Sequence, residues 1–233
     1  MRIRVSMQAS SKLEVARVKI QSEPALALLH EASCGTLATN SSQLPGYPYA
    51  TFVPYVLDEC HRPVVCISAL AEHTRNLLAD PRVSLSVLQP GASDVQAAPR
   101  LTFVADAERF EAAPEFVARF LRYEPGAEQN LALDFMFVRL NLKRMRYIAG
   151  VGKMGWIESD AWTTLPRLPV KDESDLMREA SVAVRTGLTL LGVDHFGIDY
   201  TLDGRRQRQR FPESPVPAGK LKGITLRMAA QLG

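Results

Sequence analysis

Residues 47–57 have the sequence YPYATFVPYVL, in which two kinds of position alternate along the chain. Thr51 and Val53 fall on one face of the predicted strand, and Phe52 falls on the other. This period of two residues is typical of a β-strand. Pro54 has no N–H to donate to a neighbouring strand, so it predicts an edge position, a bulge or backbone left open to a ligand.

Similar segments lie on both sides of this strand, and short turns join them. The predicted strands are residues 34–39, 47–57, 63–68, 82–88, 100–110, 135–142 and 144–151. The predicted helices of this part are residues 25–32, 70–79 and 114–123. Strands that follow one another through short turns favour an antiparallel barrel, and the sequence lacks the GxGxxG motif of a Rossmann domain.

The composition changes after Trp162, which predicts a second unit. We expect a loose lead-in over residues 1–22, a barrel domain over 23–162, a proline-containing linker over 163–172 and a small α+β domain over 173–233. In the last unit we expect a helix over 173–191, a hairpin over 197–211 and a closing helix over 218–232.

Composition and charge exclude several classes of protein. The 233 residues are 46% hydrophobic, enough for a core, and the net charge of +3 predicts neither a nucleic-acid nor a membrane partner. We find no membrane span or secretory signal and expect a cytoplasmic protein. Cys34, Cys60 and Cys66 form no CxxC motif, so neither a disulfide scaffold nor a zinc knuckle is predicted. Cys34 and Cys66 lie in predicted strands, where we expect buried thiols.

Two further groups of residues are expected to be structural. Arg206, Arg208 and Arg210 share one face of the predicted hairpin, which we expect to be solvated. Trp156 and Trp162 are expected to lie in the core or at an interface. Neither group predicts a binding site.

Residues 68–77, SALAEHTRNL, join a strand to a helix and carry several hydrogen-bond donors near the start of that helix. The donors are the side chains of Ser68, His73, Thr74, Arg75 and Asn76. Because the N–H groups at a helix N-terminus attract an anion, this segment favours a phosphate site.

These segments resemble a known family. Residues 46–55 (GYPYATFVPY), 67–77 and 79–85 are similar to the flavin-binding split barrels related to pyridoxamine 5′-phosphate oxidase, and within them to the branch that includes haem-utilisation proteins. Residues 134–135 with 147–154 resemble that branch's Gly-rich turn, and GVDHFGID (192–199) with RFP (210–212) resembles its small appended domain. The resemblance covers residues 25–230.

The resemblance implies a six-stranded antiparallel split β-barrel, mainly β with α+β additions, that forms a homodimer with FMN in grooves at the interface. It implies that one strand lies along the flavin ring, through Ala50, Thr51, Phe52, Val53 and Pro54. It also implies that five side chains approach the phosphate, namely Ser68, His73, Thr74, Arg75 and Asn76, and Lys153 is a candidate to face the flavin or a substrate anion. The expected function is that of an FMN-dependent oxidoreductase of unspecified small-molecule substrate, in which the flavin does the chemistry.

Haem binding is the alternative. The strand over residues 50–55 lacks the Arg and Lys of pyridoxamine phosphate oxidases, so we do not infer that reaction. In haem-degrading relatives the iron ligand lies towards the C-terminus, which leaves only His195 for that role, because we expect His30 on a helix face and His61 in an exposed turn. A haem-binding or haem-degrading protein, or a split barrel that binds a ligand without turnover, therefore stays open, and no other metal site is predicted.

Overall fold

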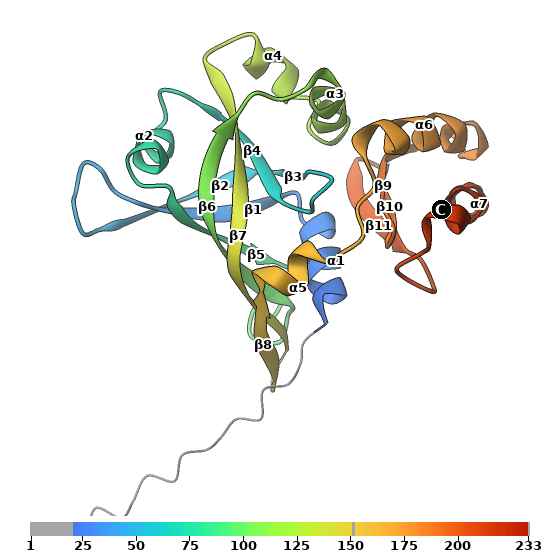
Figure 1. Cartoon of the computed structure of the whole chain (residues 1–233), viewed down its shortest axis with the longest axis horizontal. Coiled ribbons are helices and arrows are strands. Elements are labelled where there is room, and N and C mark those ends of the chain that lie inside the picture. Colours follow the sequence, from blue (N-terminus) through green and yellow to red (C-terminus); the bar gives the residue numbers. More distant parts are fainter. Residues whose placement is uncertain (1–20, 151, 233) are drawn as a thin grey trace, which may run out of the picture.

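The computed structural model describes residues 21–150 and 152–232, which form two antiparallel sheets and the helices that cover them (Figure 1). The strands of the first sheet are β1 (Cys34–Asn40), β2 (Pro48–Pro54), β3 (Val56–Leu57), β4 (Pro63–Ser68), β5 (Arg82–Leu88), β6 (Arg100–Phe110), β7 (Phe135–Gly150) and β8 (Lys153–Glu158). Those of the second are β9 (Leu188–Val193), β10 (Gly197–Leu202) and β11 (Arg205–Arg210). The α-helices are α1 (Ser22–Glu31), α2 (Glu72–Ala79), α3 (Pro114–Tyr123), α4 (Ala127–Leu131), α5 (Ser159–Thr163), α6 (Val170–Ala180) and α7 (Ala218–Ala229), and η1 (Ser181–Ala183) is a 3₁₀-helix.

The first sheet is the split barrel that the sequence predicts. Its strands follow the order β2-β1-β5-β6-β7-β4-β3, and β8 pairs with β7 beside this path. The short β3 and the hairpin strand β8 extend the six expected strands to eight. The edge position predicted from Pro54 is confirmed, because β2 stands at one end of the sheet and Pro54 is its last residue.

Alternation along the strands builds the barrel core. Leu37 of β1, Leu85 of β5, Phe103 of β6 and Met145 of β7 are all completely buried in one hydrophobic cluster. Their neighbours along each strand point to the other face, as a period of two requires. The expectation for Trp162 is confirmed, since this side chain is 2% exposed and packs edge-on against Phe103.

The prediction of two strands over residues 135–142 and 144–151 is wrong, because β7 is one strand of 16 residues. Val104 of β6 pairs with Arg144, and its neighbour Ala105 pairs with Leu142, so one residue of β7 is left over as a β-bulge. The bulge disturbs the alternation without ending the strand. The expected Gly-rich turn lies within the hairpin from β7 to β8, where Gly152 has the positive φ of +77°.

The prediction of a single helix over residues 173–191 is also wrong. Helix α6 ends at Ala180, the 3₁₀ turn η1 follows, and Gly187, with a φ of +89°, leads into β9. The C-terminal helix and the β10–β11 hairpin are confirmed. Helices α6 and α7 pack with the second sheet around a separate hydrophobic cluster, to which Leu176, Ile198 and Leu221 belong.

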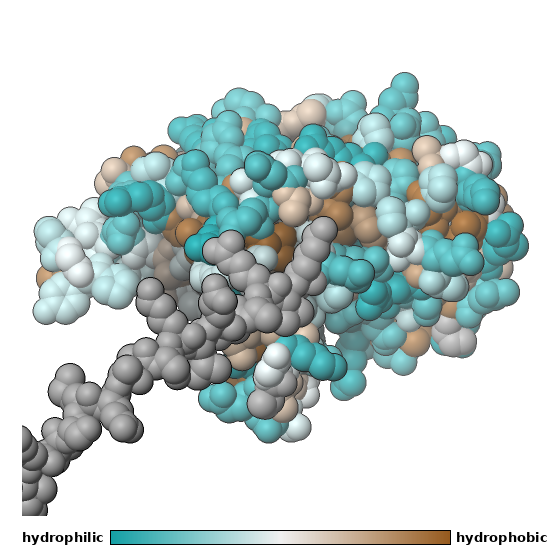
Figure 2. All heavy atoms as spheres, turned by 60° about the horizontal axis from the view of Figure 1, so that its bottom comes forward, coloured by the Kyte–Doolittle hydropathy of each residue, from teal (hydrophilic) through white to brown (hydrophobic). Residues whose placement is uncertain are grey.

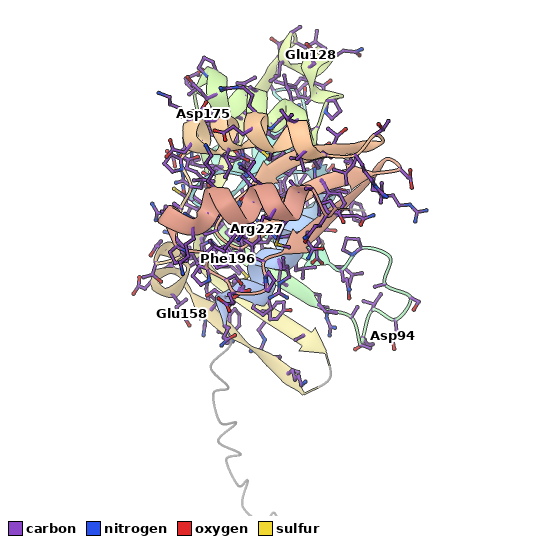
Figure 3. The ribbon with its side chains drawn as sticks, turned by 90° about the vertical axis from the view of Figure 1, so that its right-hand side faces the viewer. Asp94, Glu128, Glu158, Asp175, Phe196 and Arg227 are labelled. Carbon is purple, nitrogen blue, oxygen red and sulfur yellow. The ribbon has the colours of Figure 1, made fainter. Side chains whose placement is uncertain are left out.

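Helix α1 lies between the barrel and the second sheet (Figure 1). Every residue from 25 to 30 is buried, and the backbone carbonyl of Leu29 accepts a hydrogen bond of 2.9 Å from the Tyr55 hydroxyl. Phe196, in the turn between β9 and β10, belongs to the barrel core although it comes from the second sheet (Figure 3). The two sheets are therefore joined by packed side chains as well as by the chain.

The surface is mixed in polarity. Figure 2 shows a face that is mainly hydrophilic, with hydrophobic residues visible in separate small areas. No helix among the residues described is both long and apolar enough to cross a membrane.

Candidate functional site

The edge strand β2 presents an apolar outer face. Ala50, Phe52 and Pro54 are exposed, whereas Thr51 is half-buried and Val53 is buried. Phe52 is 78% exposed, which is unusual for a side chain of this size on a strand. Among the described residues β2 pairs with β1 alone, so alternate backbone N–H and C=O groups along its other edge remain open.

Helix α2 packs against β1 and β2, and the turn before it is closed by its own side chains. The hydroxyl of Ser68 accepts a hydrogen bond of 3.2 Å from the Leu70 N–H, and the Thr74 hydroxyl donates one of 2.6 Å to the Ser68 carbonyl. Thr74 is completely buried. Its side chain therefore holds the turn in place rather than facing a ligand.

Asn76 is also completely buried and is fully engaged within the fold. Its Oδ1 accepts hydrogen bonds of 2.8 Å from both the N–H and the hydroxyl of Ser42, and its Nδ2 donates one of 3.1 Å to the Thr39 hydroxyl. Asn76 thus ties the β1–β2 connection to α2. Of the five donors predicted for a phosphate, Thr74 and Asn76 are used by the protein itself.

His73 and Arg75 remain available. The His73 side chain is half-buried, its Nε2 has no hydrogen-bond partner, and burial lowers the pKa of its ring. Arg75 is exposed, and within the described part of the chain it makes no side-chain hydrogen bond or ion pair. We refer to His73 and Arg75, together with the exposed Leu70 before α2 and the exposed Phe52 of the neighbouring strand β2, as the α2 surface.

Lys153 lies apart from the α2 surface. It is exposed at the start of β8, and Figure 1 shows the β7–β8 hairpin at the far end of the barrel from α2. A single chain does not bring Lys153 together with His73 and Arg75.

The other three histidines are buried. His30 lies on helix α1, as expected, whereas the prediction that His61 is exposed is wrong. The exposed fractions of His30, His61 and His195 are 4%, 3% and 6%. His61 lies in a turn, as expected, but the segment after Trp162 covers it, and the Pro166 carbonyl lies 2.9 Å from its Nε2. Nδ1 of His195 lies 2.6 Å from the backbone carbonyl of Val216.

Arg208 is likewise buried, so the prediction of a solvated hairpin face is wrong for this residue. Its side chain is 1% exposed, and it donates hydrogen bonds to Asp199 (2.6 Å) and to both carboxylate oxygens of Asp194 (2.7 and 2.9 Å). Nδ1 of His30 lies 2.6 Å from Asp199, and Nε2 lies 2.9 Å from Asp194. We call His30, Asp194, Asp199 and Arg208 the ion cluster.

The ion cluster is a matched set of charges beneath α1. Although burial opposes ionisation, the Arg208 guanidinium and the His30 ring hold the pKa values of Asp194 and Asp199 below the usual range. The Tyr123 hydroxyl donates a further hydrogen bond of 2.7 Å to Asp199. A second buried pair lies nearby, where Arg119 contacts Glu173 of α6. The pairs of His30 with Asp194 and Asp199, and of Arg119 with Glu173, were missed because they join residues far apart in the sequence.

Cys34 is exposed, contrary to expectation, because its side chain lies at the start of β1, where the strand leaves the core. Cys66 is buried as expected, and burial raises the pKa of its thiol to about 11. Neither thiol lies in the α2 surface or the ion cluster as defined above.

Comparison with known proteins identifies relatives of this arrangement. The model of the family described as "Pyridoxamine 5'-phosphate oxidase" matches residues 22–149. A curated relative, described as a non-canonical haem oxygenase of the chloroplast of Arabidopsis thaliana, is 32% identical over 126 residues, which are 53% of this chain and 39% of that protein. The chain thus spans about two fifths of the length of that relative.

Two solved structures cover almost the whole chain. A haem-binding protein from Mycobacterium smegmatis has 27% identity and a TM-score of 0.58, with 90% of this chain and 96% of that chain covered. A protein of unknown function from Agrobacterium tumefaciens has 24% identity and a TM-score of 0.68, with 90% and 93% covered, and supports the fold alone. Both the barrel and the second sheet therefore have counterparts in solved proteins.

Proposed function

Because this chain belongs to the pyridoxamine 5′-phosphate oxidase family, we propose that its α2 surface binds a cofactor and that this cofactor is haem. The family supplies the fold for such a site, and two of the relatives above are described as acting on or binding haem. The choice of haem over FMN depends on one side chain of this chain, that of His73.

The observation that carries the proposal is the state of His73. Of the four histidines in the sequence, it alone is not buried, and its Nε2 has no partner. Burial lowers the pKa of the ring, so the neutral imidazole, which is the form that binds iron, predominates at neutral pH. Nε2 of His73 is buried and has no partner, which costs roughly 1–3 kcal/mol. Turning the ring to bring this nitrogen to an iron atom would therefore break no hydrogen bond at Nε2.

The surroundings of His73 suit an apolar ring with acidic substituents. Several large apolar side chains of α2, β2 and the connections next to them are exposed, and a porphyrin face could cover them. They are Leu44, Tyr47, Phe52, Leu70 and Leu78. Arg75 offers a permanent positive charge to a haem propionate. When bound, haem would supply the redox-active iron, while His73 would hold it and the apolar side chains would exclude water.

We further propose that a second copy of this chain completes the site. The open edge of β2 and the exposed Phe52 are surfaces that a partner can cover, and Lys153 would reach a cofactor of the partner rather than its own. An obligate interface of this kind buries more than about 2,000 Å² in total. Sedimentation at micromolar concentration should show a dimer, and a monomer would contradict the proposal.

The experiment is a titration of haemin into the purified protein, followed by its Soret band. Wild type should bind about one haem per chain, and His73→Ala should shift the band and weaken binding more than tenfold. Added imidazole should restore the wild-type spectrum of this variant. Glu72→Ala, a change of the preceding residue, is the control and should bind as wild type does. An unchanged spectrum in His73→Ala would show that another group holds the iron.

FMN is the second candidate, and Arg75 is the observation that favours it. An exposed guanidinium in the first turns of α2, a helix that packs against β1 and β2, could pair with a ribityl phosphate. FMN would supply hydride or electron transfer, with Arg75 fixing its phosphate and the backbone of β2 facing its ring. Absorption of the freshly purified protein separates the two cofactors, because only haem has a Soret band.

A further inference from the structure

We propose that His30, His61 and Asp194 form a binding site for a divalent metal ion of the zinc type, and that the bound ion links the barrel to the second sheet. One ligand atom from each of the three residues lies within 4.8 Å of the other two, and all three residues are buried. His30 comes from α1, His61 from the turn before β4 and Asp194 from the turn before β10. The site therefore joins three separate parts of the chain.

The contact between His30 and Asp194 has the geometry of two ligands of one ion. Nε2 of His30 lies 2.9 Å from Oδ2 of Asp194, and the two groups form an ion pair when the ring is protonated. A metal ion bound here would replace the proton of this pair. Neighbouring ligands of a tetrahedral zinc ion, at bonds of 2.0–2.1 Å, are about 3.3 Å apart.

Each histidine is also oriented by its second nitrogen, as metal-bound histidines are. Nδ1 of His30 lies 2.6 Å from the Asp199 carboxylate, and Nε2 of His61 lies 2.9 Å from the Pro166 carbonyl. With these N–H groups donated, Nδ1 of His61 has a free lone pair, and Nε2 of His30 gains one when the metal ion displaces its proton. Such outer partners fix the tautomer and the direction of a metal-binding ring.

The state of His61 suits a ligand. The backbone of His61 has a φ of +58°, which is uncommon for a residue other than glycine. Backbone strain of this kind is found mainly at functional sites. Despite this strain, the turn holds the His61 ring near the His30 ring, with 6.5 Å between the ring centroids.

A small cavity lies beside the three residues and leaves room for a fourth ligand. Its volume is about 10 Å³, enough for roughly one water molecule. Its lining includes the carboxylates of Asp58 and Glu59 and the guanidinium of Arg119, whose charge is paired with Glu173. Two histidines, one carboxylate and one water are a ligand set that zinc accepts. Closing 4.8 Å to zinc distances requires side-chain movements of about 1 Å.

The test is metal binding by the untagged full chain. After treatment with a chelator and dialysis against Zn²⁺, elemental analysis should give about one zinc per chain, and Zn²⁺ should raise the melting temperature. His61→Ala should lower the zinc affinity more than about 100-fold, because loss of an outer partner alone costs 10–100-fold. Cys60→Ser, a change in the same turn, should leave binding intact.

Co²⁺ provides a second measurement that does not depend on a variant that folds. Co²⁺ bound to wild type should show the intense visible bands of a four-coordinate ion and no sulfur charge-transfer band, because the ligands are nitrogen and oxygen. Wild type that binds no zinc at micromolar concentration would overturn the proposal. Loss of binding in Cys60→Ser, or a sulfur band with Co²⁺, would overturn it as well.

Discussion

The α2 surface and the ion cluster contain the same kinds of side chain, and the protein uses them differently. In the ion cluster the imidazole and guanidinium groups of His30 and Arg208 are buried against two carboxylates. In the α2 surface the same groups, in His73 and Arg75, have no partners among the described residues, and large apolar side chains of α2, of β2 and of the connections next to them are exposed. A buried charge must be paired for the chain to fold, whereas an unpaired group at the surface remains free for a ligand.

The difference predicts that changes in the ion cluster act on stability. Arg208→Met should leave Asp194 and Asp199 buried without their cation and lower the free energy of unfolding by about 3–5 kcal/mol. Urea denaturation in the presence of a chelator measures this loss. Arg205→Met, at the exposed start of the same strand, should change stability by less than about 0.5 kcal/mol. Equal effects of the two changes would show that the buried charges are not what stabilises this region.

Changes at the α2 surface should act on binding instead. A charge-assisted hydrogen bond contributes about 1.5–3 kcal/mol, so Arg75→Ala should weaken FMN binding roughly ten- to a hundredfold if FMN occupies the site. Riboflavin, which lacks the phosphate, should bind both proteins alike. Titration of both ligands into wild type and Arg75→Ala measures these affinities. The exposed Arg109→Ala is the control for the change in net charge. If FMN and riboflavin weaken equally, Arg75 does not hold a phosphate.

Asn76 follows Arg75 on the same helix but, unlike Arg75, faces inward. Asn76→Ala removes the acceptor of the Ser42 N–H and should cost about 1–3 kcal/mol of stability. Thermal unfolding should show the loss, whereas Arg75→Ala should unfold as wild type does. An Asn76→Ala protein of normal stability with weakened cofactor binding would place Asn76 at the ligand instead.

The smallest effect is expected where a charge pair is exposed. Lys222 of α7 contacts Glu179 at 2.6 Å, but its side chain is 64% exposed. Such pairs contribute less than about 1 kcal/mol and weaken with salt. Lys222→Ala should therefore change the melting temperature little, and less at high ionic strength. A loss as large as that of Arg208→Met would mean that burial is not what separates the two kinds of pair.

The barrel could be predicted from the sequence because its information is local. The alternation of Thr51, Phe52 and Val53 gives the two faces of β2, and Pro54 gives its edge position. The length of β7 could not be predicted, because a bulge is defined by the strand opposite and the alternation within β7 breaks at that point. Strand β8 was missed because it too is defined by the strand opposite, β7, with which it pairs.

The candidate sites were predictable to different degrees. Sequence reasoning proposed His73 and Arg75 as ligand-binding residues, because helix N-termini have recognisable signals, but it could not show that Thr74 and Asn76 point inward. The ion cluster could not be predicted from the sequence. The alternating RRQRQR of β11 is polar on both faces, and nothing local shows that α1 covers Arg208. Only the packing of α1 against β11, far along the chain, distinguishes a buried Arg208 from a solvated one.

The position of α1 also has a consequence for how the protein is made. His30 pairs with Asp199, which is 169 residues further along the chain. At about 5–20 residues per second, a ribosome needs roughly 10–30 s to synthesise that interval. During this time α1 has been made but its partners in the second sheet have not. The apolar residues of α1 that face the barrel can pack as the barrel forms, while the His30 ring must stay hydrated. Helix α1 is therefore synthesised well before the partners that complete its packing.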